Sequence, residues 1–266
     1  MTSPESNPQV RLRESGLLRR DWIAGLERGL MIMEAFGEAH PRMTAAQVGE
    51  RVAMTRTAAR RYLLTLQHAG YIATDGKLYW LTPRVLRLGQ AYIDSSRLAR
   101  IVQPFLQRVT AGTSEAAYVS IMEGNDIVYI ARNGPNRAMN TGYVLGARVP
   151  AHVTAAGLLL VALCDSPGAD EWLDQQTLNS FTSHTIVDKL QLRELFHRIR
   201  GQGWSVSEQQ LELGYRGVAV PLRDARGQVV AALNVTMPIG QESTEHAVHR
   251  VLNVLTGVAA ALRPLV

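Results

Sequence analysis

Two short helices separated by a tight turn, within residues 44–69, constrain the fold of this chain more than any other feature. The second helix is predicted to begin at Arg56, with Thr55 as its N-cap, and at 100° per residue it has two distinct faces. Its apolar face carries Ala59, Tyr62, Leu63 and Leu66. Its opposite face carries, within the first turn and a half, Arg56, Thr57, Arg60 and Arg61. Helix-turn-helix modules insert such a cationic first turn into the major groove, where guanidinium groups bond guanine edges or phosphate oxygens.

A β-hairpin is predicted directly after these helices. Two strand-like runs in residues 71–81 flank Asp75-Gly76, and a type I′ turn needs positive φ at both central residues. Helix, turn, helix and hairpin is the order of a winged helix, with Lys77 beside the tip of the wing. The residues expected to contact double-stranded DNA are Thr44, Thr55, Arg56, Thr57, Arg60, Arg61 and Lys77. The order of elements argues against a merely solvated amphipathic helix, and the arginine cluster argues against a winged helix used only for protein or RNA contacts.

The net positive charge of the chain comes entirely from its first part. Residues 1–100 contain 15 Lys+Arg and 9 Asp+Glu, a net +6, whereas the rest of the 266 residues contain 13 and 14, a net −1. This asymmetry is expected if only the first part neutralises phosphates. The length suggests about two domains. The single cysteine, Cys164, excludes an intrachain disulfide, and there is no apolar run long enough to span a membrane, so we expect a cytoplasmic protein.

The remaining elements of the first part surround this motif. Residues 1–20 are polar and are expected to be a disordered arm, after which Asp21 caps a helix at 22–36. The inward stripe of that helix is predicted to be Ile23, Leu26, Leu30 and Met33. Thr82-Pro83 begins a linker helix at 83–96, because a cap residue followed by proline is a typical helix start. Its apolar side is suited to packing either on its own domain or on a second copy of the chain.

Strands and helices are mixed in the remainder of the chain. Strands are predicted at 116–122, 126–132, 137–143, 204–206, 217–222 and 229–236. Helices are predicted at 98–110, where Pro104 marks a kink or restart, and at 154–163, 171–173, 187–200 and 243–262. This pattern predicts the α+β class, with a central mixed sheet flanked by helices.

Residues suited to catalysis or metal binding do not form a recognisable site. The chain has no Gly-x-Ser-x-Gly elbow, no phosphate-binding glycine loop and no cysteine pairs of zinc spacing. Cys164 follows an apolar helix and is interpreted as a buried thiol. His246 and His249 share one helix side without a third ligand, which favours a solvated face. We therefore expect no catalytic residue, no metal and no cofactor.

Several strings together resemble the IclR family of bacterial transcriptional regulators, over nearly the whole chain from about Asp21 to Leu262. They are IAGLERGLMIMEAF, MTAAQVGERVAMTRTAARRYLLTL, YWLTPRVLRLG, LGARVPAHVTAAGLLLVAL and ELGYRGVAVPLRDARGQVVAALNVT. The strings ARRYLLTLQHAGY and LTPRVLRLGQAYI look most like the branch that regulates aromatic-acid catabolism, the PobR, PcaU and PcaR type. The resemblance implies a winged helix-turn-helix domain at 21–82, a linker helix, and a GAF-like effector domain at 97–266 that binds a small organic acid. It also implies dimers or tetramers.

The resemblance further implies a set of effector-binding residues. Carried over position by position, these are Ala138, Thr141, Tyr143, Arg148, His152, Ala155, Ala156, Ser207, Tyr215, Gly217, Asn234 and Thr236. Ala155 and Ala156 also have a physical rationale, because small side chains let a carboxylate approach the free N–H groups of a helix start. Arg132, Arg148 and His152 are the cations placed to reach a second polar group of the ligand, although each also suits a surface ion pair.

The expected ligand is an aromatic or cyclic acid. Where glyoxylate- and allantoin-type members carry an acidic residue and a cysteine, this chain has Ser207 and Gly217. Without that carboxylate, and with Tyr215, Asn234 and Thr236 present, the site suits a larger and flatter molecule. The alternatives are a regulator responding to a glyoxylate-like or dicarboxylate ligand, and an enzyme with an appended DNA-binding domain.

Overall fold

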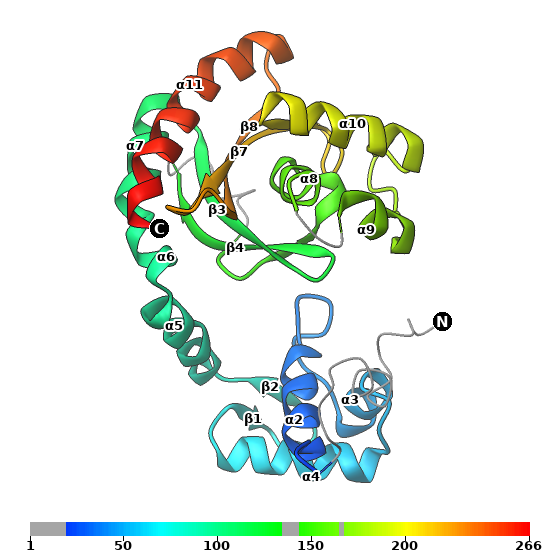
Figure 1. Ribbon diagram of the computed structural model, residues 1–266. Coiled ribbons are helices and arrows are strands. Elements are labelled where there is room, and N and C mark those ends of the chain that lie inside the picture. The colour runs from blue at the N-terminus through cyan, green and yellow to red at the C-terminus, as the bar shows by residue number, and fades with distance from the viewer. Residues whose placement is uncertain (1–19, 135–143, 165–167) are drawn as a thin grey trace. The chain divides into compact units, whose positions relative to one another are not determined.

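The computed structural model describes residues 20–134, 144–164 and 168–266 (Figure 1). These residues belong to two compact units, and the division falls between Ala91 and Tyr92. The predicted arm and the predicted strand at 137–143 lie outside the described residues, and with that strand so do Ala138, Thr141 and Tyr143. Within the described residues, no helix combines the length and apolar character needed to cross a membrane.

The first unit has the predicted order of helices and hairpin. Its elements are α2 (Ala24–Glu34), α3 (Ala45–Arg51), α4 (Arg56–His68), β1 (Ile72–Thr74) and β2 (Tyr79–Leu81), then a 3₁₀ turn (Pro83–Val85) and the first part of α5 (Leu86–Ser95). Ile32, Val48, Leu63 and Tyr79 meet in its core, one from each of α2, α3, α4 and the hairpin. The core therefore joins the hairpin to the helix-turn-helix as one unit.

Side-chain caps begin both helices of the helix-turn-helix. Thr44 and Gln47 form a reciprocal capping box at the start of α3, and the Thr55 hydroxyl accepts a hydrogen bond from Ala58 N at 3.2 Å. Between the helices, a Cβ on Gly49 would lie 2.7 Å from the carbonyl oxygen of Met54. Only glycine fits this approach, so Gly49 of α3 lets the turn before α4 pass close to that helix.

The prediction for α2 was wrong in its start and in its buried face. The helix begins at Ala24, with Ile23 at the N-cap and no side-chain cap from Asp21. Ile23 is 68% exposed, and Leu26 and Leu30 are exposed as well. The buried residue is Ile32, which lies on the opposite side at 100° per residue. The helix has two apolar sides, and only the one that faces the core of this unit is covered.

The turn of the hairpin also differs from the prediction. Thr74 pairs with Tyr79, so four residues connect the strands, and only Gly76 has a positive φ. The Asp75 carboxylate accepts hydrogen bonds from the backbone N–H of Lys77 at 2.9 Å and of Leu78 at 2.7 Å. These side-chain bonds stabilise the turn in place of a type I′ backbone.

The second unit is built around one six-stranded sheet. Its strands are β3 (Ala116–Glu123), β4 (Asp126–Asn133), β5 (Arg148–Pro150), β6 (Ser205–Glu208), β7 (Tyr215–Arg223) and β8 (Val229–Pro238). They lie in the order β5-β4-β3-β8-β7-β6, and every neighbouring pair is antiparallel. The predicted mixed sheet was therefore wrong. The chain leaves the sheet at the edge strand β5 and re-enters at the opposite edge, so its helical excursion joins two edges and creates no parallel neighbours.

Helices cover both faces of the sheet (Figure 1). The helices of this unit are α6 (Arg97–Ile101), α7 (Gln103–Thr113), α8 (Ala155–Ala162), α9 (Ala169–Gln175), α10 (Lys189–Gln202) and α11 (Thr244–Leu262). Helices α7 and α11 pack on one face of the sheet. Helices α8, α9 and α10 contribute to the hydrophobic core on the other face. All eight residues of α8 are buried. The start of this helix therefore lies inside the domain, and this placement determines the candidate binding site.

Candidate functional site

The exposed side of α4 is a free cationic surface. Arg56, Thr57, Arg60 and Arg61 are all exposed, while Ala59 and Leu63 on the other side are fully buried. In the part of the chain that the structure describes, none of the three arginines forms an ion pair. Lys77 is exposed beside the wing turn. This geometry leaves the guanidinium groups available to phosphates and base edges.

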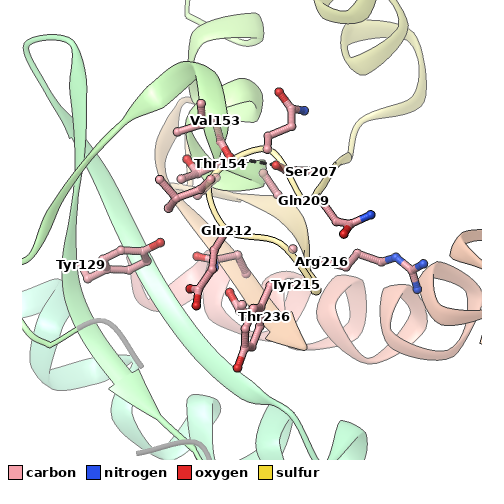
Figure 2. Close-up of a pocket in the computed structure, with 15 residues that line it drawn as sticks. Tyr129, Val153, Thr154, Ser207, Gln209, Glu212, Tyr215, Arg216 and Thr236 are labelled. Atoms are coloured by element: carbon pink, nitrogen blue, oxygen red, sulfur yellow. Dashed lines mark hydrogen bonds between the residues drawn. The ribbon is translucent and has the colours of Figure 1, made fainter. Parts of the chain in front are cut away.

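A cavity lies between the start of α8 and strands β6, β7 and β8 (Figure 2). The space between its lining atoms is about 410 Å³, a volume that includes the part open to solvent. It is lined by Tyr129, Val153, Thr154, Ala155, Ala156, Ser207, Gln209, Gln210, Leu211, Glu212, Tyr215, Arg216, Gly217, Asn234 and Thr236. Seven of these residues are ones that the resemblance implied: Ala155, Ala156, Ser207, Tyr215, Gly217, Asn234 and Thr236.

Backbone donors occupy one side of the cavity. Thr154 caps α8 and its hydroxyl accepts a hydrogen bond from Gly157 N at 3.0 Å. The preceding N–H groups, of Ala155 and Ala156, have no intrahelical acceptor because they belong to the first turn. Both residues line the cavity, and each has only a methyl side chain. An anion placed there would gain two hydrogen bonds and the favourable end of the helix dipole.

Several side-chain groups of the cavity are already committed to the protein. The Ser207 hydroxyl donates to the carbonyl oxygen of Val153 at 2.9 Å. The side-chain oxygen of Asn234, which also lines the cavity, accepts a hydrogen bond from the Ser120 hydroxyl at 3.1 Å. Figure 2 shows Tyr129 and Glu212 pointing into the same space. The cavity thus presents a carboxylate as well as donors.

Arg216 borders the cavity, but Figure 2 shows its guanidinium pointing away from it. The guanidinium is 3% exposed and donates from Nε to Glu208 Oε2 at 2.7 Å. It also donates to Thr244 Oγ1 at 3.0 Å, and that hydroxyl donates to Glu208 Oε2 at 2.5 Å. The hydrogen bond from Arg216 holds the pKa of Glu208 below its ordinary value. This network ties β6 and β7 to the start of α11 on the side opposite the cavity.

Arg148 and His152 lie outside the cavity. Arg148 forms ion pairs with Glu123 and Asp126, which are close to it because β4 pairs with β5. His152 is buried, and its Nε2 lies 3.0 Å from the carbonyl oxygen of Asn179. Both side chains have partners within the protein and neither lines the cavity, so their contact with a ligand stays a prediction. Arg132 is half-buried on β4 and also has partners within the protein.

Two family models together cover most of the chain. Residues 25–76 match the IclR helix-turn-helix domain, and residues 90–263 match the C-terminal domain of the bacterial transcriptional regulator IclR. The chain belongs to the IclR family. Its N-terminal helix-turn-helix and its C-terminal antiparallel sheet with helices match the structures of this family.

Relatives from aromatic catabolism are among the matches to this IclR-family chain. The Pca regulon regulatory protein of Pseudomonas putida is 40% identical over 243 residues, covering 91% of this chain and 84% of the relative. The p-hydroxybenzoate hydroxylase transcriptional activator of Acinetobacter baylyi is 35% identical over 271 residues, covering 100% and 97%. The crystal structure of an IclR homologue from Microbacterium hydrocarbonoxydans complexed with 4-hydroxybenzoate is 26% identical with a TM-score of 0.73, covering 90% and 99%. The resemblance to the aromatic-acid branch is confirmed.

Sequence reasoning missed about half of the cavity lining in this IclR-family chain. The residues missed are Tyr129, Val153, Thr154, Gln209, Gln210, Leu211, Glu212 and Arg216. Strand alternation could have indicated Tyr129, because it follows the buried Ile127 by two positions. The loop at 209–214 had no such signal, since hydroxyl groups distant in sequence hold it: Thr182 and Thr185 donate to the carbonyl oxygens of Gln209 and Gln210.

Proposed function

We propose that this IclR-family chain is a cytoplasmic transcription factor that binds operator DNA through α4 and the wing and responds to an aromatic acid in the cavity at the start of α8. One observation carries the proposal. Ala155 and Ala156 both line the cavity, and their own N–H groups belong to the first turn of a buried helix, where they have no intrahelical acceptor. A carboxylate is the ligand group that this arrangement favours.

The other end of the ligand is proposed to be a hydroxyl donor. If the ligand carried a second carboxylate, that group would lie close to the carboxylate of Glu212. Like charges at close range repel, so a dicarboxylate is unfavourable. A phenolic hydroxyl can instead donate to the Glu212 carboxylate or to Tyr129. The support from relatives points the same way, because two of them act in p-hydroxybenzoate regulation or are complexed with 4-hydroxybenzoate.

A thermal-stability screen tests this choice of ligand. A hydroxybenzoate at about 100 times its Kd should add about 2.7 kcal/mol to the free energy of unfolding. Phthalate and succinate, tested at the same concentrations, should add much less because each carries a second carboxylate. Stabilisation by a dicarboxylate with none by any hydroxybenzoate would contradict the proposed ligand class and favour the dicarboxylate alternative.

Replacement of Arg60 by alanine tests the proposed DNA contact of α4. If Arg60 is bidentate to a guanine, the substitution should weaken binding to a duplex from the chain's own upstream region by about 1–3 kcal/mol. It should also relax sequence preference at one base pair. A matched substitution, Arg28→Ala, removes an exposed arginine from α2 and should change affinity little. Equal weakening of Arg60→Ala on all duplexes would make this residue a phosphate contact.

A homodimer is proposed to form through α5. Leu88 and Tyr92 are exposed one helical turn apart on one side of α5, and Leu86 is 74% exposed, so this helix carries uncovered apolar side chains. A second copy of the same helix would cover them, and two recognition helices suit half-sites about 34 Å apart. Sedimentation velocity at micromolar concentration should give the mass of a dimer or tetramer. A monomer under those conditions would contradict this proposal.

A further inference from the structure

The guanidinium of Arg42 lies over the ring of Trp80, a residue of the wing strand β2. The Cζ atom of Arg42 is 4.2 Å from the centroid of the Trp80 ring, within the range of a cation–π contact. Arg42 precedes α3 by three residues, and Trp80 lies in the middle of β2. Neither residue belongs to the recognition helix or to the tip of the wing.

The backbone fixes this contact. Met43 and Tyr79 exchange two hydrogen bonds, from Met43 N to Tyr79 O at 3.0 Å and from Tyr79 N to Met43 O at 2.8 Å. Both side chains are buried in the core of the unit. Because side chains alternate along extended backbone, the neighbouring residues Arg42 and Trp80 face outward together. The guanidinium is thus held on the surface by the pairing beneath it.

Arg42 carries a positive charge on the surface of the first unit. Among the described residues, no carboxylate forms an ion pair with it. Asp75 is the acidic group of the wing turn, and its pKa is lowered chiefly by the backbone N–H groups of Leu78 and Lys77, with a smaller contribution from Arg42. The Asp75 carboxylate is therefore committed to the turn. The electrostatic contribution of Arg42 to Asp75 indicates that Arg42 lies near the wing turn, and among the described residues the two groups form no ion pair.

We propose that Arg42, held on Trp80, binds a phosphate of the DNA duplex and so fixes the position of the winged domain on its operator. This inference rests on the proposed DNA-binding function. The first helix of a helix-turn-helix crosses the phosphate backbone, and Arg42 lies just before the Thr44 cap of that helix, near the wing. Contact with the ring restricts the Arg42 side chain before DNA binds, so little side-chain freedom is lost when its planar guanidinium binds a phosphate.

The test compares Arg42→Ala with a matched variant on the same hairpin. Arg84 also lies over an aromatic ring, with Cζ 5.4 Å from the Tyr71 centroid, but it is at the base of the hairpin. Binding is measured for the full chain by fluorescence anisotropy, on a duplex from its upstream region and on a scrambled duplex, between about 50 and about 200 mM salt. Arg42→Ala should lower the affinity of the protein for both duplexes by about tenfold. It should also reduce the slope of log K against log salt by about 0.9 per protomer. Arg84→Ala should stay within about twofold of the wild type.

Two further variants separate a phosphate contact from a structural stack. Arg42→Lys keeps the charge but loses the planar stack, so it should recover most of the salt slope and only part of the affinity. Trp80→Leu as a single substitution should weaken DNA binding, because it removes the support of Arg42. Added to Arg42→Ala, the same substitution should cause little further loss of affinity. Melting temperatures identify any variant that fails to fold.

The possible outcomes distinguish this inference from the function on which it rests. A wild-type protein that binds no duplex contradicts the DNA-binding function, and the phosphate contact with it. If the wild type binds but Arg42→Ala keeps the same affinity and salt slope, only the phosphate contact is contradicted. Equal losses in Arg42→Ala and Arg84→Ala would assign the effect to overall charge and would also overturn the inference.

Discussion

Replacement of Glu208 by alanine is expected to lower the free energy of unfolding by about 3–5 kcal/mol, because it leaves a buried guanidinium without its counter-ion. Arg216 is 3% exposed, so water cannot replace the lost carboxylate. The opposite change, Arg216→Ala, should be smaller in effect, at about 2 kcal/mol, since Glu208 is 34% exposed and can be rehydrated. Urea unfolding monitored by circular dichroism measures both values.

Two controls distinguish a buried pair from ion pairing in general. Arg148→Ala removes the exposed pairs with Glu123 and Asp126 and should change stability by at most about 1 kcal/mol. The double variant Glu208→Ala with Arg216→Met should recover most of the loss, because no unpaired charge remains in the interior. A Glu208→Ala variant as stable as the wild type would show that Arg216 finds solvent after all.

The same pair gives stability a defined dependence on pH. The pKa of Glu208 is lowered in the folded state, chiefly by the hydrogen bond from Arg216, so the folded state favours the ionised carboxyl. The stabilisation is therefore complete above the unfolded pKa and is lost as pH falls through the folded pKa. The difference in stability between wild type and Glu208→Gln should shrink as pH falls below about 4.3. A difference that is constant down to the acid transition would contradict this assignment.

Replacement of Ala156 by leucine is expected to reduce effector affinity at least about a hundredfold, because the added side chain occupies the space in which a carboxylate would approach the start of α8. Ala156 is almost fully buried, so three added carbons cannot turn outward. DNA binding by α4 should persist, since it belongs to the other unit. Isothermal titration with a hydroxybenzoate identified by the stability screen measures the loss.

Ala162→Leu is the matched control for this prediction. Ala162 is equally buried at the other end of α8 but does not line the cavity. Both variants should lose about 1–3 kcal/mol of stability through overpacking, and only Ala156→Leu should lose the ligand. Equal affinity in the two variants would remove Ala156 from the binding site.

Much of the site could be predicted because its signals are local. Thr55, Thr82 and Ser243 cap the helices that the sequence places after them, and each acts over two or three residues. The exposure of the α4 arginines follows from the helical period, because Ala59 and Leu63 face the core and the arginines lie on the other side of the helix. The small residues at the start of α8 were found through the resemblance and line the cavity as a consequence of the Thr154 cap.

The sequence by itself determined the capped starts of α4 and α11, the order of helices and hairpin in the first unit, and the cationic face of α4, because these depend on neighbours within a few residues. The tertiary structure decided which side of α2 is buried, that the sheet is antiparallel, and that Arg148 pairs with Glu123 and Asp126. It also decided the composition of the cavity, in which Ser207 meets Val153 and Asn234 meets Ser120. These partners are 54 and 114 residues apart, so no local period or cap determines their contact. The packing of the segment before α8 against β6 brings Val153 to Ser207, and the pairing of β3 with β8 brings Ser120 beside Asn234.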